Sequence, residues 1–359
     1  MKPLTDSAAV APGVFSIVEP DGSPARAVDP PLSDEETIEA LRWMRLSRAV
    51  DERALSLQRQ GKLGTFPPVH GQEAAVVGTA MALDPSRDWI VPQYRELPAM
   101  LRHGYPLERY LLALKGDPLG SAIPEDVRVL PMQIALAAQL PHAAGLAWGL
   151  RRRGLDGVVM AYIGEGACSE GDFHEACNLA GVMRAPLVVV VQNNGWAIST
   201  PRERQSAGDT IACRAQGYGF AGVVADGNDV QATYHCAQEA VARCRDGGGP
   251  TILELMTYRM GPHTTADDPS RYVDAEVLDE WRRQDPIERA VAYLAARGGF
   301  DDEAEREMAE WVDATIDEAW AQASARSAPG PERIFEQVYA SEPARLAAQR
   351  AGAIGRAGG

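Results

Sequence analysis

The chain has 359 residues, of which 45% are hydrophobic and 24% are charged. This composition is that of a globular protein with a large buried core, and the length permits either two domains or one α/β domain with tails. There are 35 lysine and arginine residues against 50 aspartate and glutamate residues, which gives a net charge of −15. A charge of this sign repels phosphate backbones and argues against a nucleic-acid partner.

The five cysteines form no CxxC pair, so the sequence indicates neither a disulfide framework nor a thiolate zinc site. The first residues, MKPLTDSAAVAPG, lack the basic stretch and apolar run of a signal peptide. No apolar run reaches the roughly 18 residues that a membrane span needs. We therefore expect a cytoplasmic protein with no membrane partner.

The first 33 residues include six prolines among small and acidic residues, which predicts an extended arm (residues 1–33) with at most a short strand at residues 14–18. Ser33 and the three acidic residues after it form a capping box at the positive end of a helix dipole. Apolar residues at helical spacing follow. We predict that the folded body begins here, with a helix that ends near residue 60.

Further elements follow from the spacing of apolar residues. Helices are predicted to begin after residue 72 and to cover residues 107–114, 142–152, 170–183 and 230–245. Strands are predicted over residues 158–163, 187–192, 222–225 and 251–257. Residues 119–130 are rich in proline, glycine and acids, which predicts a long loop.

Strands that are continuous apolar runs and alternate with amphipathic helices predict a parallel sheet buried on both faces. The expected fold class is α/β, with a doubly wound, mostly parallel sheet and helices on both faces. From residue 274 the chain is helical and charged, and little would anchor its end. We expect one main domain over residues 34–342, which includes these C-terminal helices, and a flexible tail over residues 343–359.

The most informative segment is residues 161–200, AYIGEGACSEGDFHEACNLAGVMRAPLVVVVQNNGWAIST. One predicted strand ends just before Gly164-Glu165-Gly166, and the next ends at Gln192-Asn193-Asn194. Consecutive parallel strands end side by side at the carboxyl edge of a sheet, so we expect Glu165 and Asn194 to face one another. One carboxylate and one amide oxygen beside glycines suit a magnesium ion that also binds a diphosphate.

The segment allows two other interpretations. A dinucleotide-binding loop would continue GxGxxG from Gly164, but Ser169 stands where the third glycine is required, and GxxxxGK[ST] is also absent. The segment could also be a plain strand–helix connection followed by a turn. The 26 residues between Gly166 and Asn193, the strand–helix–strand pattern around them and the closing GWAIST argue against that alternative.

With these features the sequence resembles the α subunits of the thiamine diphosphate-dependent 2-oxo acid dehydrogenases, which carry a GDG or GEG triplet and an NN pair at about this separation. The resemblance runs from about residue 33 to residue 339. It includes LQRQGKLGTF, GQEAA, VPQYRELPAML, DGNDV, ELMTYRMGPHTTADDPSRY and QDPIERAVAYL. It implies a thiamine diphosphate-binding fold, with the arm and the tail outside it.

The resemblance also implies site residues. Glu165, Asn194 and the backbone carbonyl of Trp196 would bind Mg²⁺. The remaining positions would contact the cofactor: Gly164 beside it, the backbone N–H groups of Gly166 and Ala167 on the diphosphate, Gln192 as a further diphosphate contact, Gln93, Tyr94 and Arg95 at phosphate-binding positions, and Leu136 beside the aminopyrimidine ring. Without the resemblance, Arg95 would be interpreted as a surface salt bridge.

His263 matches the active-site histidine of the family. It would contact the diphosphate and assist acyl transfer to lipoamide, a role that suits an imidazole near neutral pH. A lone loop histidine is otherwise usually solvated. Thr264 stands where some animal relatives are phosphorylated, and we interpret it as a loop hydroxyl.

The implied function is that of the α subunit of a 2-oxo acid dehydrogenase. It would decarboxylate pyruvate and transfer the acyl group to a lipoyl-bearing acyltransferase core, within an α2β2 heterotetramer whose β subunit supplies the glutamate that activates the cofactor. Residues 116–131, GDPLGSAIPEDVRVLP, resemble pyruvate-type enzymes, whereas Glu165 is familiar from branched-chain ones. We give the loop more weight. A branched-chain 2-oxo acid (3-methyl-2-oxobutanoate) is the alternative substrate, and acetoin is a third possibility.

Two functions of other classes remain. A nicotinamide-dependent dehydrogenase would need the missing third glycine. A non-catalytic scaffold with the same fold is disfavoured because Tyr94, Arg95, Glu165, Asn194 and His263 are all present together.

Overall fold

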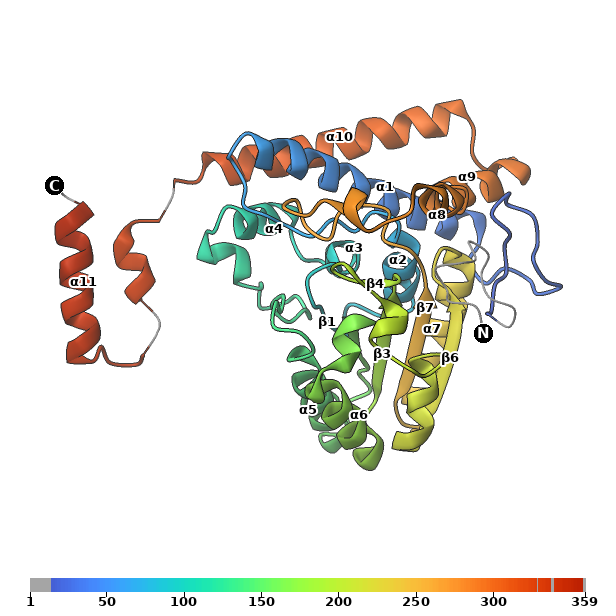
Figure 1. Cartoon of the computed structure of the whole chain (residues 1–359), viewed down its shortest axis with the longest axis horizontal. Helices are drawn as coiled ribbons and strands as arrows, with labels where there is room; N and C mark the ends of the chain where they lie inside the picture. Colours follow the sequence, from blue (N-terminus) through green and yellow to red (C-terminus); the bar gives the residue numbers. More distant parts are fainter. Residues whose placement is uncertain (1–13, 328, 337–338, 358–359) are drawn as a thin grey trace.

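The computed structural model describes residues 14–327, 329–336 and 339–357. Its centre is a five-stranded sheet in the order β1-β2-β3-β7-β6, and every neighbouring pair is parallel (Figure 1). The strands are β1 (Trp89–Val91), β2 (Val159–Gly164), β3 (Leu187–Asn193), β6 (Ala221–Asp226) and β7 (Thr251–Met256). The predicted parallel sheet is confirmed, and β1 is a strand that we did not predict.

The α-helices are α1 (Asp34–Arg59), α2 (Glu73–Met81), α3 (Leu97–Arg102), α4 (Leu107–Leu114), α5 (Gln139–Arg152), α6 (Gly171–Met183), α7 (Val230–Arg245), α8 (Ala275–Arg282), α9 (Pro286–Ala296), α10 (Asp302–Ala325) and α11 (Ala344–Ala357). Short 3-10 turns are η2 (Pro118–Ser121), η3 (Gly166–Ser169), η4 (Arg202–Arg204), η5 (Ala212–Tyr218), η6 (Pro269–Arg271) and η7 (Pro331–Phe335). The predicted bounds of α4 and α7 are confirmed, whereas α5 begins three residues earlier than predicted.

Alternate residues of the strands point to opposite, buried faces. Met160 and Tyr162 of β2 belong to a cluster with α2 and α7, whereas Ala161 and Ile163 belong to a second cluster with α5 and α6. Helices therefore cover both faces of the sheet, as the doubly wound fold requires. Within the part of the chain described, no helix combines the length and apolarity that a membrane span requires.

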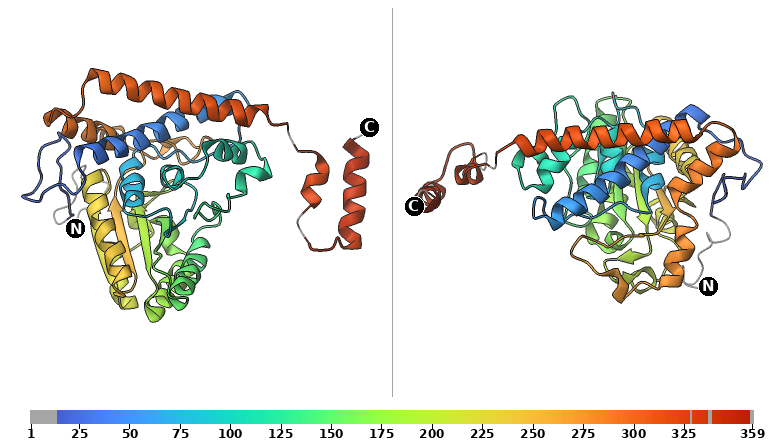
Figure 2. Two further views of the ribbon diagram at one scale, coloured as in Figure 1. Left: turned by 180° about the vertical axis from the view of Figure 1, so that it is seen from behind. Right: turned by 90° about the horizontal axis from the view of Figure 1, so that it is seen from above.

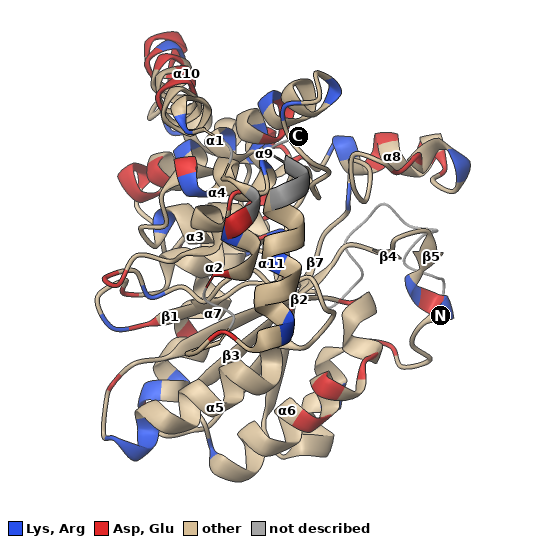
Figure 3. Ribbon diagram, turned by 90° about the vertical axis from the view of Figure 1, so that its left-hand side faces the viewer, with Lys and Arg blue, Asp and Glu red and all other residues tan. Residues whose placement is uncertain are grey.

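A further helical layer lies over one end of the sheet. α1 begins with the predicted capping box, in which the Ser33 hydroxyl accepts the Glu36 N–H and the Glu36 carboxylate accepts the Ser33 N–H. α10 lies along α1 (Figure 2). The acidic residues of α10 are largely exposed, as expected for a solvated helix face (Figure 3).

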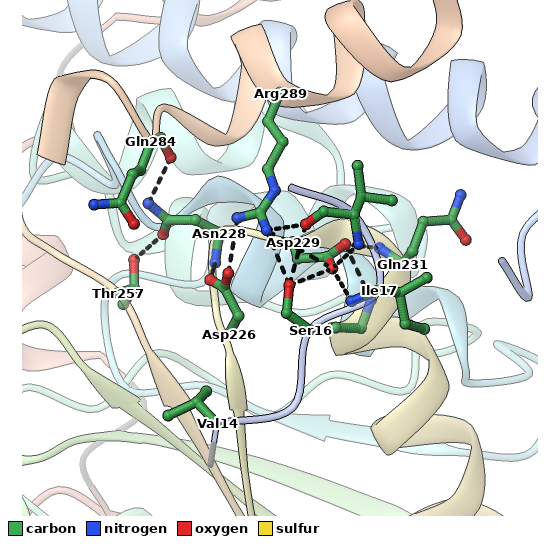
Figure 4. Close-up of polar contacts among 12 residues, drawn as sticks. Val14, Ser16, Ile17, Asp226, Asn228, Asp229, Gln231, Thr257, Gln284 and Arg289 are labelled. Atoms are coloured by element: carbon green, nitrogen blue, oxygen red, sulfur yellow. Dashed lines mark hydrogen bonds and ion pairs between the residues drawn. The ribbon is translucent and has the colours of Figure 1, made fainter. Parts of the chain in front are cut away.

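The described part of the N-terminal arm packs against the body. Ile17 and Val18 are buried, and Phe15 forms a parallel bridge with Ala225 at the edge strand β6. One carboxylate oxygen of Asp229 accepts the N–H groups of Ile17 and Val18 over 2.6 and 2.8 Å (Figure 4). These residues continue the core past the edge of the sheet. Residues 1–13 of the predicted arm lie outside the described residues.

The predicted tail contains a helix that we did not predict, α11. Figure 1 shows it apart from the sheet and the helices that cover it, beside η7. Residues 358–359 of the tail lie outside the described residues.

Candidate active site

A cavity of about 330 Å³ lies at the carboxyl edge of the sheet. Its walls are the segments that follow β1, β2 and β3, the hairpin of β4 (Trp196–Ala197) and β5 (Thr200–Pro201), and the loop after β7. Such edges are the usual ligand sites of α/β folds. The cavity brings together every site residue that we predicted, namely Gln93, Tyr94, Arg95, Leu136, Gly164, Glu165, Gly166, Ala167, Gln192, Asn194, Trp196 and His263.

Glu165 and Asn194 are neighbours in the cavity wall. The backbone N–H of Asn194 donates to Oε2 of Glu165 over 3.3 Å. The other carboxylate oxygen, Oε1, is buried and has no partner among the described residues, and burial raises the pKa of Glu165 to about 7. A cation at this oxygen would satisfy it and favour the charged carboxylate.

The other two predicted metal ligands line the same cavity as Glu165. Asn194 Nδ2 donates to Gln72 Oε1 over 3.0 Å, and Asn194 Oδ1 accepts the N–H of Trp196 over 3.2 Å. The Trp196 carbonyl accepts a long bond, 3.4 Å, from Nη1 of Arg259. A set of one carboxylate, one amide oxygen and one carbonyl suits Mg²⁺. Among the described residues, no group of three or more His, Cys, Asp or Glu side chains is placed so that it could hold a metal ion.

Gly166 allows the hairpin to close over the turn after β2. A Cβ at this position would lie 2.3 Å from Cβ of Ala197 and 2.9 Å from Oε1 of Gln205. The turn η3 begins at Gly166, and N–H groups at the start of a helical turn lack partners within it. Those of Gly166 and Ala167 are therefore suited to an anionic oxygen.

Glu96 fixes the side chain of Gln192, and the backbone N–H of Gly164 fixes that of Gln93. Oε2 of Glu96 accepts the backbone N–H groups of Gln93 and Arg95, each over 2.9 Å, and its Oε1 accepts Nε2 of Gln192. The free polar atom of Gln192 is consequently Oε1, whereas Gln93, whose Oε1 accepts the Gly164 N–H, leaves Nε2 free. A free acceptor suits a donor such as a metal-bound water better than the phosphate oxygen that the resemblance implies for Gln192.

Arg95 is buried and holds the loop after β7. Nη1 donates to the carbonyl of Pro68 over 2.6 Å, and Nη2 lies 3.1 Å from both Nδ1 and the carbonyl oxygen of His263. The ring of Tyr94 meets the His263 ring edge-on, with 6.3 Å between centroids. The alternative of a surface salt bridge at Arg95 is therefore wrong, because the side chain lies inside.

His263 is neutral in this environment at pH 7. Burial and the charges of Arg95 and Arg259 lower its pKa from 6.5 to about 4. Because its Nδ1 faces guanidinium donors, we assign its hydrogen to Nε2. Nε2 of His263 is then a hydrogen-bond donor.

The loop that carries His263 is fastened at several points. Asp267 Oδ2 accepts the backbone N–H of His263 over 2.7 Å and the hydroxyl of Tyr272. Arg259 Nη2 donates to this hydroxyl over 2.7 Å and to the Ile198 carbonyl over 2.6 Å, which joins the loop to the hairpin. The Thr264 hydroxyl accepts the Ala266 N–H within the loop.

Several lining residues were missed by the sequence analysis: Gln72, Glu96, Ser169, Glu170, Ala197, Ile198 and Gln205. Gln72 and Glu96 stand inside the motifs GQEAA and VPQYREL, which were used only as family markers. Their place was the signal that could have found them: Glu96 directly follows the predicted phosphate-binding residues Tyr94 and Arg95, and Gln72 directly precedes a largely apolar helix.

Comparisons with known proteins agree on one family. The model described as "Dehydrogenase E1 component" matches residues 41–332. The chain is 40% identical over 324 residues to the pyruvate dehydrogenase E1 component subunit alpha of Bacillus subtilis, covering 90% of this chain and 87% of the relative. It is 39% identical over 338 residues to the protein of the same name from Staphylococcus epidermidis, covering 94% and 91%. The chain therefore belongs to the dehydrogenase E1 component family, as an α subunit of the 2-oxo acid dehydrogenase type.

Proposed function

We propose that this chain is the α subunit of a pyruvate dehydrogenase E1 component, which decarboxylates pyruvate with thiamine diphosphate and Mg²⁺ and transfers the acetyl group to lipoamide. The observation that carries the proposal is that one cavity gathers all twelve predicted residues, in a chain 40% identical to a pyruvate dehydrogenase α subunit.

The polar atoms of the cavity fit a metal diphosphate. Four residues that line it each have one buried side-chain atom without a partner among the described residues, namely Oε1 of Glu165, Oε1 of Gln192, Nε2 of Gln72 and Nε2 of Gln93. Buried polar groups are normally satisfied, so two unmet acceptors beside two unmet donors indicate a ligand with both cationic and anionic parts.

The residues would divide between the metal and the diphosphate. Glu165, Asn194 and the Trp196 carbonyl would hold Mg²⁺. Arg95, with its fixed fork of donors, and the Tyr94 hydroxyl would hold phosphate oxygens. Thiamine diphosphate, when bound, supplies the electron sink for decarboxylation.

His263 would serve first as a neutral donor through Nε2. A diphosphate bound in the cavity would bring negative charge near the ring, and nearby negative charge raises the pKa of an imidazole. The imidazole would then hold a proton at Nε2 for the acyl-transfer step, as a general acid.

We further propose an α2β2 assembly with a β subunit and docking to a lipoyl-bearing acyltransferase core. Two apolar side chains at the cavity, Leu136 and Ile198, are 44% and 56% exposed, and Ile134 nearby is 72% exposed. A site for this chemistry excludes water, so a second chain over these side chains would complete it. A cytoplasmic location is part of the same proposal.

We propose pyruvate rather than a branched-chain 2-oxo acid as the substrate. Glu165 favours the branched-chain alternative only weakly, because glutamate and aspartate bring equal charge to Mg²⁺. The relatives named above are pyruvate dehydrogenase subunits, and acetoin finds no support among them.

The test is an assay of the chain alone and of the chain with its β subunit, using ferricyanide as the electron acceptor. We expect no activity for the chain alone and activity for the pair. We also expect kcat/KM for pyruvate to exceed that for 3-methyl-2-oxobutanoate and acetoin by about 10-fold or more, which is the discrimination a few methyl groups can give. Robust turnover by the chain alone would contradict the need for a β subunit, and a preference for 3-methyl-2-oxobutanoate would contradict the substrate.

A further inference from the structure

Gln72 lies at the junction between α2 and the cavity, and its backbone is fixed from both sides. The preceding Gly71 has a φ of 92°, and a Cβ there would lie 2.4 Å from the Tyr258 carbonyl oxygen. The Gly71 carbonyl accepts the hydroxyl of Thr257 over 2.7 Å, and the Gly71 N–H donates to Glu73 over 2.9 Å. Gln72 therefore cannot shift without moving both the segment that follows β7 and the start of α2.

The side chain of Gln72 determines the orientation of Asn194. The two ends of an asparagine amide differ, because only the oxygen can bind a cation. Gln72 Oε1 accepts Nδ2 of Asn194 over 3.0 Å, which commits the nitrogen end to Gln72 and leaves Oδ1 as the only end available to a metal.

The nitrogen end of the Gln72 amide has no hydrogen-bond partner among the described residues. Gln72 is a fully buried residue of the cavity lining, and the atom without a partner is its Nε2. Leaving a buried donor unsatisfied costs about 1–3 kcal/mol, so a ligand atom is its expected partner.

A purely structural amide in the same molecule looks different. Gln231, at the start of α7, is buried to the same degree and is bonded at both ends. Its Oε1 accepts the Leu32 N–H over 2.9 Å, and its Nε2 donates to the Thr37 hydroxyl over 2.9 Å. Gln231 is therefore a matched control for the loss of a buried amide.

We propose that Gln72 is a positioning residue of the metal site and a binding residue of the diphosphate: its carbonyl oxygen presents Asn194 Oδ1 to the divalent cation, and its amide nitrogen donates to an oxygen of the diphosphate. This rests on the proposed function, because it assumes a metal diphosphate in this cavity. Nothing in the sequence pattern or in the family's implied ligand set assigned the role.

Three variants of the chain, each paired with the β subunit, separate the two roles. Gln72→Met removes both ends of the amide at similar volume. Gln72→Glu keeps an acceptor for Asn194 Nδ2 but loses the donor. Gln231→Met removes a buried amide that does not line the cavity. Titration with MgCl₂ at saturating thiamine diphosphate, and with thiamine diphosphate at saturating MgCl₂, is followed by tryptophan fluorescence. Melting temperature is measured without either ligand.

We expect Gln72→Met to raise the MgCl₂ concentration needed for half-saturation by about 10–100-fold, because loss of a residue that orients a metal ligand typically weakens metal binding by this factor. For Gln72→Glu, the half-saturating MgCl₂ concentration should be close to that of the wild type. The same variant should bind thiamine diphosphate more weakly than the wild type, because it lacks the amide donor. Gln231→Met should lower only the melting temperature.

The proposal would be overturned if Gln72→Met bound Mg²⁺ and thiamine diphosphate as the wild type does. It would also be overturned if Gln72→Glu were as impaired in Mg²⁺ binding as Gln72→Met, because the Gln72 side chain would then act only by packing. Failure of the wild-type pair itself to bind thiamine diphosphate with Mg²⁺ would instead refute the proposed function.

Discussion

The protonation of His263 is controlled by the charges that face it. Arg95 and Arg259 approach Nδ1, the Tyr94 ring closes one side, and Asp267 binds the backbone N–H rather than the ring. The two guanidinium groups and burial lower the pKa together, and Asp267 opposes them only weakly. The role that the sequence suggested, a proton donor near neutral pH, therefore requires a ligand that changes this balance.

We expect carbon-13 NMR of labelled histidine to show one imidazole with a pKa near 4, which disappears in His263→Asn. Because the pKa is lowered from 6.5 to about 4, the unfolded state binds more protons between these values. The contribution of His263 to the free energy of unfolding is therefore complete above pH 6.5 and is lost as the pH falls towards 4. Adding Mg²⁺ and thiamine diphosphate should raise this pKa. A value near 6.5 without ligand would contradict the geometry.

For cofactor binding, the negative charge of Glu165 should matter more than the length of its side chain. Glu165→Ala removes the only predicted carboxylate ligand, whereas Glu165→Asp keeps its charge. We expect Glu165→Ala to weaken cofactor binding by about 10–100-fold or more in a titration with Mg²⁺, and Glu165→Asp far less. Glu170→Ala is the control, because Glu170 lines the same cavity but is exposed. Equal affinities for Glu165→Ala and the wild type would refute the metal assignment.

The residues that meet ligand directly could be found from the sequence because they stand together in the short motifs GEG, QNN and QYR. Residues that act by positioning another residue could not be found from the sequence. Glu96 presents Gln192, and Arg259 joins the His263 loop to the hairpin, across 96 and 61 positions respectively. Such roles depend on contacts that form only after the sheet is assembled, and no local pattern marks them.

At the scale of elements, length decided what could be predicted. α1 and α7 have capping residues and several turns of apolar spacing, and their starts follow from Ser33 and Asp229. β1 has three residues and β4 two, which is too short for a strand pattern to emerge. α11 was missed because its alanine-rich sequence has helix propensity but little to pack against.

The position of the hairpin of β4 and β5 should depend on the absence of a side chain at Gly166. Gly166→Ala places a methyl group against Ala197 and pushes the hairpin, which carries the Trp196 carbonyl, away from Glu165. We expect thiamine diphosphate affinity, measured with Mg²⁺, to fall by about 10-fold or more, since disturbing the groups that orient metal ligands typically costs about 10–100-fold in metal affinity. Gly171→Ala at the start of α6 is the control, because open space surrounds that position apart from Glu175 at 3.9 Å. Equal effects of the two substitutions would contradict the fit.

At the scale of the whole molecule, the arm, the sheet edge and the C-terminal helices meet at one buried charge cluster (Figure 4). Arg289 of α9 donates to Asp226 at the end of β6 over 2.8 Å and to the Ser16 hydroxyl over 3.0 Å. Asp229 caps α7 with one carboxylate oxygen and holds the arm with the other. The sequence did not reveal this junction, because its members lie up to 273 positions apart.

Arg289→Met should destabilise the whole molecule. The side chains of Arg289 and Asp226 are 4% and 1% exposed, so the substitution leaves a buried carboxylate without its counter-charge. Removing one partner of a buried pair typically costs about 3–5 kcal/mol. Arg282→Met is the control: its pair with Asp279 is 61% exposed on both sides, and such a pair contributes about 0–1 kcal/mol. Urea unfolding of the three chains measures the difference.

The pH dependence of Arg289→Met provides a second measurement. Burial already raises the pKa of Asp226, and Arg289 opposes that rise. Without the guanidinium the pKa of Asp226 rises further, so the folded variant retains a proton that the unfolded chain releases above about pH 4. The free energy of unfolding of Arg289→Met relative to the wild type should therefore decrease as the pH is raised from about 5 to about 8. A destabilisation that is constant over this range would show that Asp226 finds another donor once Arg289 is gone, and the junction would then depend on packing of the arm rather than on its charges.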